Sequence, residues 1–151
     1  MELAIGTCLA GYKISKCLYT SKTNGAVYSA YKIAEREEKD NFAACRILAD
    51  QLGWTCVLLP RSLEPNVKTA DMMRSDDLTV WEIKTNSTGT VSSIDNELRA
   101  AKSQSKNVII RFTKEHLATK KLEQAALKRV WRSGIEKLIF IAGVKARFVK
   151  V

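Results

Sequence analysis

The chain has 151 residues, of which 46% are hydrophobic and 27% are charged, and it contains two prolines. This length suits one domain with a sizeable core. No apolar run approaches the ~18 residues that a membrane span requires, so we expect none. The apolar start of the chain lacks a basic n-region and a clear cleavage site, which argues against a signal peptide.

The cysteines and the histidine argue against a zinc site. Cys8, Cys17, Cys45 and Cys56 form no CxxC pair, and His116 is the only histidine. Cys45 and Cys56 lie in apolar patterns typical of small core residues. We therefore expect reduced thiols and a cytosolic site of action.

The net charge of +9 is unevenly distributed. Residues 35–82 carry a net charge of −4, which leaves +13 for the remainder. A basic exterior around an acidic centre suits a metal-using enzyme that cleaves a polyanion. A generic basic protein with an acidic first helix has the same distribution, so both interpretations stay open.

The first third of the chain predicts a hairpin, a helix and a strand. Residues 12–33 form the hairpin, in which Asn24 and Gly25 predict a type I′ turn. Residues 35–51 show apolar 3–4 spacing with acids in the first turns, and Gly53 is the expected C′ residue of this helix. The nearly continuous apolar run 54–59 predicts a buried central strand.

The last third predicts two helices and three strands. Ser92 is the expected N-cap of a helix that ends at Gln104, with Asp95 at N3. A second helix over 114–133 stops at Gly134. Its predicted inner stripe consists of Leu117, Leu122, Ala125, Ala126, Val130 and Trp131. The predicted strands are 108–112 and a closing hairpin formed by 138–141 and 146–149 around Gly143.

This order of elements predicts one α/β domain with a mixed central sheet flanked by helices. Residues 1–34 form an N-terminal β-hairpin extension in this interpretation, and residues 35–151 form the core.

Three charged residues in the middle of the chain form the candidate catalytic centre. A strand at 68–71 and another that includes Glu82 and Lys84 are predicted to pair antiparallel across a turn at 75–77. Strand alternation places Glu82 and Lys84 on one face, with Trp81 and Ile83 on the other. Asp71 and Glu82 would bind Mg²⁺ or Mn²⁺, while Lys84 orients water or stabilises charge on phosphate. The alternative is an edge strand with a solvated Glu–Lys pair.

The acid-rich helix offers a third carboxylate. Glu38 and Asp40 are two residues apart and project about 200° from each other, so we do not expect both at one site. Glu38 lies four residues before the apolar Phe42, and we prefer it to Asp40.

Basic and polar residues in the second half form a candidate RNA-binding surface. These are Lys121, Lys128 and Arg129 on the long helix, Arg99 and Lys102 on the preceding helix, and Thr85 in the polar loop 85–90. The alternatives are a solvated helix face and a simple connecting loop.

The spacing of Asp71, Glu82 and Lys84 is the signature of the PD-(D/E)xK nuclease superfamily. Combined with the run 104–110, this spacing resembles the C-terminal tRNA-nuclease toxin domain of contact-dependent growth inhibition (CdiA-type) proteins, which has relatives in phage and mobile elements. The likeness covers about residues 35–151. Ala70 replaces the more usual proline and Arg61 replaces an expected acid, which leaves subfamily and substrate open.

The resemblance implies a metal-dependent endonuclease toxin that hydrolyses structured RNA, with tRNA as the first candidate. It implies a centre formed by Asp71, Glu82 and Lys84, with an acid near Glu38. It also implies an immunity protein, which the +9 charge predicts to be acidic, and delivery into the cytoplasm from another cell as part of a larger secreted protein. A DNA endonuclease of restriction or repair type and a non-catalytic RNA-binding module remain alternatives.

Overall fold

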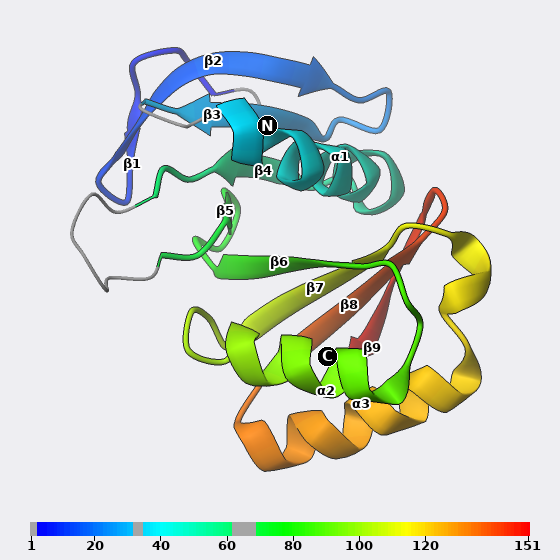
Figure 1. The fold of residues 1–151 in the computed structure, drawn as a ribbon. Helices are drawn as coiled ribbons and strands as arrows, with labels where there is room; N and C mark the ends of the chain where they lie inside the picture. Colours follow the sequence, from blue (N-terminus) through cyan, green and yellow to red (C-terminus); the bar gives the residue numbers. More distant parts are fainter. Residues whose placement is uncertain (1–2, 32–34, 62–68) are drawn as a thin grey trace. The chain divides into compact units, whose positions relative to one another are not determined.

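The computed structural model describes residues 3–31, 35–61 and 69–151, with backbone alone for residues 35–38. The chain divides into two compact units, residues 1–80 and 81–151. The helices and strands of each unit are labelled in Figure 1.

The first unit contains a mixed sheet and one helix. Its strands neighbour one another in the order β1-β2-β3-β4-β5, and all its strand pairs are antiparallel except β3–β4. Parallel strands need a crossover connection, and helix α1 supplies it. The elements are β1 (Cys8–Leu9), β2 (Tyr12–Thr20), β3 (Ala26–Ala30), α1 (Glu35–Leu52), β4 (Thr55–Leu58) and β5 (Met72–Arg74).

The predicted N-terminal hairpin is confirmed as β2–β3, but its turn is not type I′. Asn24 has a positive φ of 69°, whereas Gly25 is not among the positive-φ residues. Gly25 is instead required by space, because a Cβ there would lie 2.6 Å from the carbonyl oxygen of Ala49 in α1. The close approach of a helix therefore determines this glycine, which the local turn pattern does not reveal.

Helix α1 and strand β4 agree with the predictions. All of β4 is buried, and Cys45 and Cys56 are buried free thiols. Gly53 has a φ of 67° and donates its N–H to the carbonyl of Ala49, which ends the helix as expected.

The strand predicted at 68–71 lies later in the chain, as β5 (Met72–Arg74). Lys68 falls outside the described residues. Asp71 directly precedes β5, and its carbonyl accepts a hydrogen bond from the N–H of Leu59. Pro60 has no N–H and cannot extend the ladder, so regular pairing starts only after Asp71.

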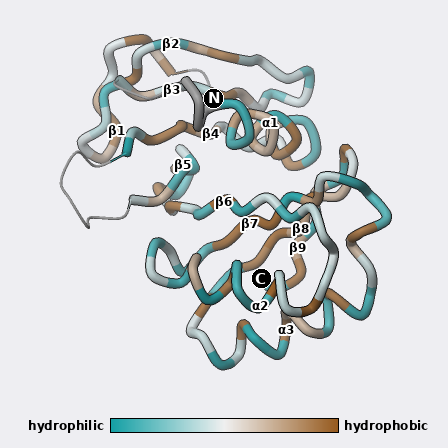
Figure 2. The backbone as a smooth tube through the Cα atoms, viewed as in Figure 1, coloured by the Kyte–Doolittle hydropathy of each residue, from teal (hydrophilic) through white to brown (hydrophobic). Residues whose placement is uncertain are grey.

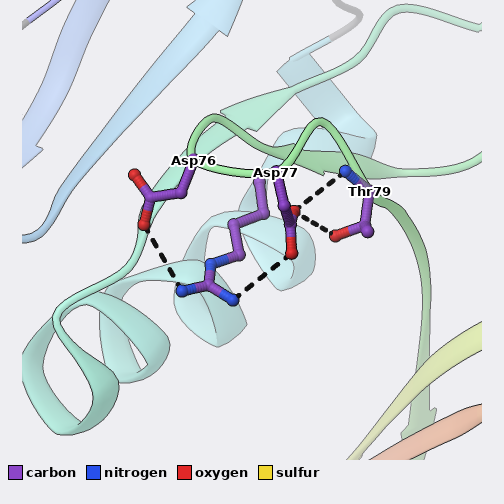
Figure 3. A network of polar contacts seen from close by, with 4 residues as sticks. Asp76, Asp77 and Thr79 are labelled. Atoms are coloured by element: carbon purple, nitrogen blue, oxygen red, sulfur yellow. Dashed lines mark hydrogen bonds and ion pairs between the residues drawn. The ribbon is translucent and has the colours of Figure 1, made fainter.

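The turn that follows β5 is held by side chains (Figure 3). The Arg74 guanidinium contacts Asp76 at 3.3 Å and Asp77 at 3.5 Å. Asp77 also accepts hydrogen bonds from the N–H and hydroxyl of Thr79. The predicted turn at 75–77 is therefore present.

The second unit is a four-stranded sheet in the order β6-β7-β8-β9 with helices between its strands. Strands β6, β7 and β8 are parallel, and β9 returns antiparallel. The elements are β6 (Val80–Asn86), α2 (Val91–Ala101), β7 (Asn107–Phe112), the 3₁₀ turn η1 (Glu115–Leu117), α3 (Lys120–Ser133), β8 (Lys137–Ala142) and β9 (Lys145–Lys150).

Helices α2 and α3 cover one face of this sheet (Figure 1). Ile94 and Leu98 from α2 and Leu122 and Ala126 from α3 join one core cluster with Val108, Ile110, Leu138 and Phe140 from the strands. The hydropathy colouring shows this apolar character along β7 and β8 (Figure 2). The face that carries Val108 and Ile110 is therefore the helix-covered face.

Both helices of the second unit start differently from the predictions. Thr90, not Ser92, caps α2: it is extended and its side chain accepts from the N–H of Ser93. Helix α2 ends at Ala101 rather than Gln104. The long helix α3 begins only after Thr119, whose side chain accepts a hydrogen bond from the N–H of Leu122. The non-helical Ala118 separates α3 from the preceding turn η1. Each hydroxyl satisfies an otherwise unpaired N–H of the first turn.

The C-terminal part confirms two predictions and corrects one. Gly134 ends α3 in the left-handed conformation, and Gly143 lies in the closing hairpin between β8 and β9. Trp131, however, is 77% exposed and does not belong to the inner stripe. It follows the buried Val130, and one residue rotates the side-chain direction about 100° around a helix.

The predicted α/β class is confirmed, with mixed strand pairing, flanking helices and an N-terminal hairpin. The predicted boundary between residues 34 and 35 stays a prediction, although β3 pairs with β4 across it. Among the helices of the described residues, none is long and apolar enough to cross a membrane.

Candidate functional site

Glu82 and Lys84 lie on β6 as predicted, and their side chains face the helices. Glu82 is in register with Val108, and Lys84 with Ile110. Residues in register on parallel strands project to the same side of a sheet, so both charged side chains share the helix-covered face. The opposite face carries Trp81, whose ring packs edge-on against Phe148 at 6.4 Å between centroids.

The two charged residues differ in burial. Glu82 is 1% exposed, whereas Lys84 is half-buried. The Lys84 ammonium donates a hydrogen bond to the Gln104 side chain at 3.4 Å. Burying a carboxylate is costly unless hydrogen bonds or a cation compensate it, which separates Glu82 from an ordinary solvated surface pair.

Asn86 and Glu97 are further polar residues beside Glu82 and Lys84, and neither was predicted as a site residue from the sequence. The Asn86 amide donates to the Glu97 carboxylate at 2.9 Å and to the Ser93 hydroxyl at 2.8 Å. Its carbonyl oxygen accepts the N–H of Gly89 at 2.8 Å. Two signals pointed to them: Asn86 follows Lys84 by two residues on one strand face, and Ser93 and Glu97 have i,i+4 spacing on a helix.

The carboxylate of Glu97 is electrostatically linked to Lys84. Burial raises the pKa of Glu97, while the hydrogen bond from Asn86 and the positive charge of Lys84 act in the opposite direction. Glu82, Lys84, Asn86 and Glu97 therefore form a polar strip along β6 and α2 within an otherwise apolar face.

Asp71 lies in the first unit, apart in the chain from this polar strip. It is half-buried at the start of β5. Burial raises the pKa of the Cys45 thiol, and the contributions of Cys56 and Asp71 add to this effect. A shared cation site of Asp71 and Glu82 stays a prediction. Among the described residues, no group of three or more acidic, cysteine or histidine side chains is placed to hold a metal ion.

The third-carboxylate prediction is open. The side chain of Glu38 lies outside the described residues. Asp40 is exposed.

A basic groove runs between α2 and α3 and includes three predicted RNA-binding residues. Lys121, Lys128 and Arg129 line it with Arg132, and its volume is about 340 Å³. Asp95 also lines it and lies 3.7 Å from Arg129.

The remaining predicted RNA-binding residues do not line the groove. Arg99, Lys102 and Thr85 are all exposed. Thr85 adjoins Lys84 on β6 and therefore projects to the opposite face. The structure thus gathers the predicted residues of α3 and leaves the other three outside this groove.

Comparison with known proteins gives a family match and a structural match. Residues 76–145 match the model of the contact-dependent growth inhibition CdiA C-terminal domain. This stretch includes Glu82, Lys84 and the basic groove but begins after Asp71. No curated protein matches the chain.

The fold is similar to that of a chain in the CdiA-CT/CdiI toxin and immunity complex from Burkholderia pseudomallei. The TM-score is 0.54 at 20% identity, and the match covers 77% of this chain and 86% of the other. At this identity the likeness concerns the fold. The match over residues 76–145 to the contact-dependent growth inhibition CdiA C-terminal family confirms the resemblance that the sequence predicts.

Proposed function

We propose that this toxin domain is a metal-dependent endonuclease that hydrolyses structured RNA, with tRNA as its expected substrate. The main supporting observation is the placement of Glu82 and Lys84 on the helix-covered face of β6. A buried carboxylate beside a half-buried ammonium is an uncommon arrangement on an apolar face. It supplies the two charges that phosphodiester hydrolysis uses.

Lys84 is the proposed electrostatic catalyst. Its ammonium is oriented by Gln104 and lies near the Glu97 carboxylate. A positive charge that is partly removed from water interacts more strongly with developing phosphate charge than a solvated one does. Asn86 and Glu97 are proposed positioning residues, because they connect β6 to α2 around Lys84.

Asp71 and Glu82 are the proposed ligands of Mg²⁺ or Mn²⁺, with Glu38 as the third carboxylate. Carboxylate oxygens are the donors that these cations prefer. When bound, such a cation polarises phosphate and increases the acidity of water. The chain itself would position the carboxylates, with Glu82 on β6 and Asp71 ahead of β5.

The basic groove is the proposed contact surface for the RNA backbone. Lysine and arginine side chains neutralise phosphates without reading sequence. Four of the residues that line the groove are basic. This surface would hold the substrate while the polar strip carries out the chemistry.

We also propose an acidic immunity protein as the inhibitor. The structurally similar protein was solved as a toxin and immunity complex. A partner of opposite charge would be attracted by the net charge of +9 and would associate rapidly at low salt.

Incubation of tRNA and plasmid DNA with the protein, with Mg²⁺ or with EDTA, tests the proposed activity. We expect Mg²⁺-dependent cleavage of tRNA and none of DNA. Lys84→Ala and Glu82→Ala should each lower the rate ~10²–10³-fold, as loss of a charge-stabilising group does. Lys145→Ala is the matched control, because Lys145 is exposed in the β8–β9 hairpin.

Wild-type cleavage by both variants would show that this active-site assignment is wrong. Cleavage of DNA alone would establish a DNA nuclease. Circular dichroism spectra that match the wild type are needed to assign the loss to chemistry rather than folding.

A further inference from the structure

Trp131 occupies an unusual position for a tryptophan. It is 77% exposed, whereas Trp54 and Trp81 are 3% and 1% exposed. The chain contains three tryptophans in all. Exposure of a large aromatic ring to water is unfavourable, and exposed tryptophan is characteristic of binding surfaces.

A lysine from the last strand holds the ring in place. The Lys150 ammonium lies 5.2 Å from the centroid of Trp131. The same ammonium donates a hydrogen bond to the carbonyl of Ile135 at 2.9 Å. Lys150 is therefore fixed at its tip, and its cation–π contact restrains the ring without burying it.

The ring adjoins the basic groove. Lys128 precedes Trp131 by three residues in α3, so the two side chains are neighbours on the helix surface. Lys128 lines the groove, as does Arg132, the residue after Trp131. Positive charge thus lies beside the ring along the helix and above it at Lys150.

We propose that Trp131 is a stacking platform for an unpaired base of RNA whose neighbouring phosphates lie in the groove between α2 and α3. The proposal rests on the proposed RNA-binding function and adds the substrate feature, a single-stranded segment. Every nucleobase has a face that stacks on an aromatic ring, and basic side chains beside the ring hold the backbone. The cationic surroundings favour a polyanion over an apolar partner.

Tryptophan fluorescence measures this contact in the unmodified chain, because Trp54 and Trp81 are buried and soluble quenchers reach mainly Trp131. The measurements are made in EDTA, which removes the divalent cation and so keeps the RNA uncleaved. The probes are a single-stranded oligouridylate and an RNA duplex of equal length. We expect the single strand to quench the emission and to protect Trp131 from acrylamide, and the duplex to do so much less.

Variants separate stacking from charge. Trp131→Ala should weaken binding of the single strand about 5- to 150-fold with an unchanged dependence of affinity on salt. Trp131→Phe should restore most of the affinity. Lys128→Gln should instead reduce the slope of log affinity against log salt by about 0.7. Val144→Ala, which alters an exposed apolar residue outside the groove, is the matched control.

The outcomes distinguish this inference from the function on which it rests. Binding of the single strand with Trp131 still open to acrylamide and with full affinity in Trp131→Ala would overturn the stacking platform alone. If no RNA binds at low salt, both the stacking platform and the proposed RNA-binding function are wrong. Protection of Trp131 by an acidic protein but not by RNA would assign the surface to a protein partner and would also overturn the inference.

Discussion

The Asn86 amide at the end of β6 donates a hydrogen bond of 2.9 Å to the carboxylate of Glu97 on α2. The two residues are 11 positions apart. This contact connects the strand that carries Glu82 and Lys84 to the helix that covers it. Asn86 is 1% exposed, so its polar atoms depend on these partners.

Asn86→Ala should destabilise the fold by about 1–3 kcal/mol, because it removes partners from buried polar groups. The N–H of Gly89 and the Glu97 carboxylate both lose a bond. Denaturant unfolding measures the free energy. The exposed neighbour Asn96 supplies the control Asn96→Ala, for which we expect a change within about 0.5 kcal/mol. Equal stability of the two variants would contradict a structural role for Asn86.

Glu38→Gln should raise the metal concentration needed for tRNA cleavage, whereas Asp40→Asn should change it little. The reason is helical phase: Glu38 is four residues before Phe42, and Asp40 lies about 200° away from Glu38. Asp40 is exposed, in agreement with this ranking. Titration of Mg²⁺ against cleavage rate decides it, and the reverse ranking would identify Asp40 as the third carboxylate.

Reversal of Lys121, Lys128 and Arg129 to glutamate should weaken binding of all RNA sequences alike. These side chains line the groove and would contact phosphates, whose neutralisation releases counterions. Affinity measured at several salt concentrations should show a shallower slope. Lys13, Lys16 and Lys22, in or beside the N-terminal hairpin, provide a matched triple reversal. A greater loss of RNA affinity in that control would show that the hairpin, and not the groove, is the RNA-binding surface.

The paired residues Glu123 and Arg147 should contribute pH-dependent stability. The Arg147 guanidinium donates two hydrogen bonds to the Glu123 carboxylate, at 2.8 and 2.7 Å, and thereby lowers the pKa of Glu123 from its ordinary 4.5. A lowered carboxyl pKa stabilises the fold above the unfolded pKa, and this contribution is lost as pH falls through the folded value.

Arg147→Ala should therefore lower Tm at pH 7 by a small amount, since exposed pairs contribute about 0.2–1 kcal/mol. The difference from the wild type should shrink below pH 4.5 as Glu123 becomes protonated. Thermal melts from pH 7 to pH 3 measure it. A difference that is constant with pH would assign the effect to packing of Arg147 against Phe140, whose ring centroid lies 6.0 Å away.

Local pattern by itself determined much of this protein. Apolar periodicity located most of the helices and strands, and Gly53 and Gly134 marked helix ends because a left-handed residue costs glycine little. Strand alternation placed Glu82 and Lys84 on one face. These features depend on neighbours within a few residues, which is the range over which a sequence pattern carries conformational information.

Only the tertiary structure decided which hydroxyl caps each helix, which residues meet across elements and which side chains are covered. Threonine and serine are both favoured N-cap residues, so Thr90 and Ser92 were both candidates. The path of the chain from β6 into α2 makes Thr90 the N-cap. Asn86 meets Glu97, and Gly25 lies against Ala49, because packing brings distant segments together. Trp131 stays exposed because packing turns the side of α3 with Leu122, Ala126 and Val130 to the core, and Trp131 lies about 100° around the helix from Val130. Such contacts are set by the packing of whole elements, and a local periodicity contains no information about them.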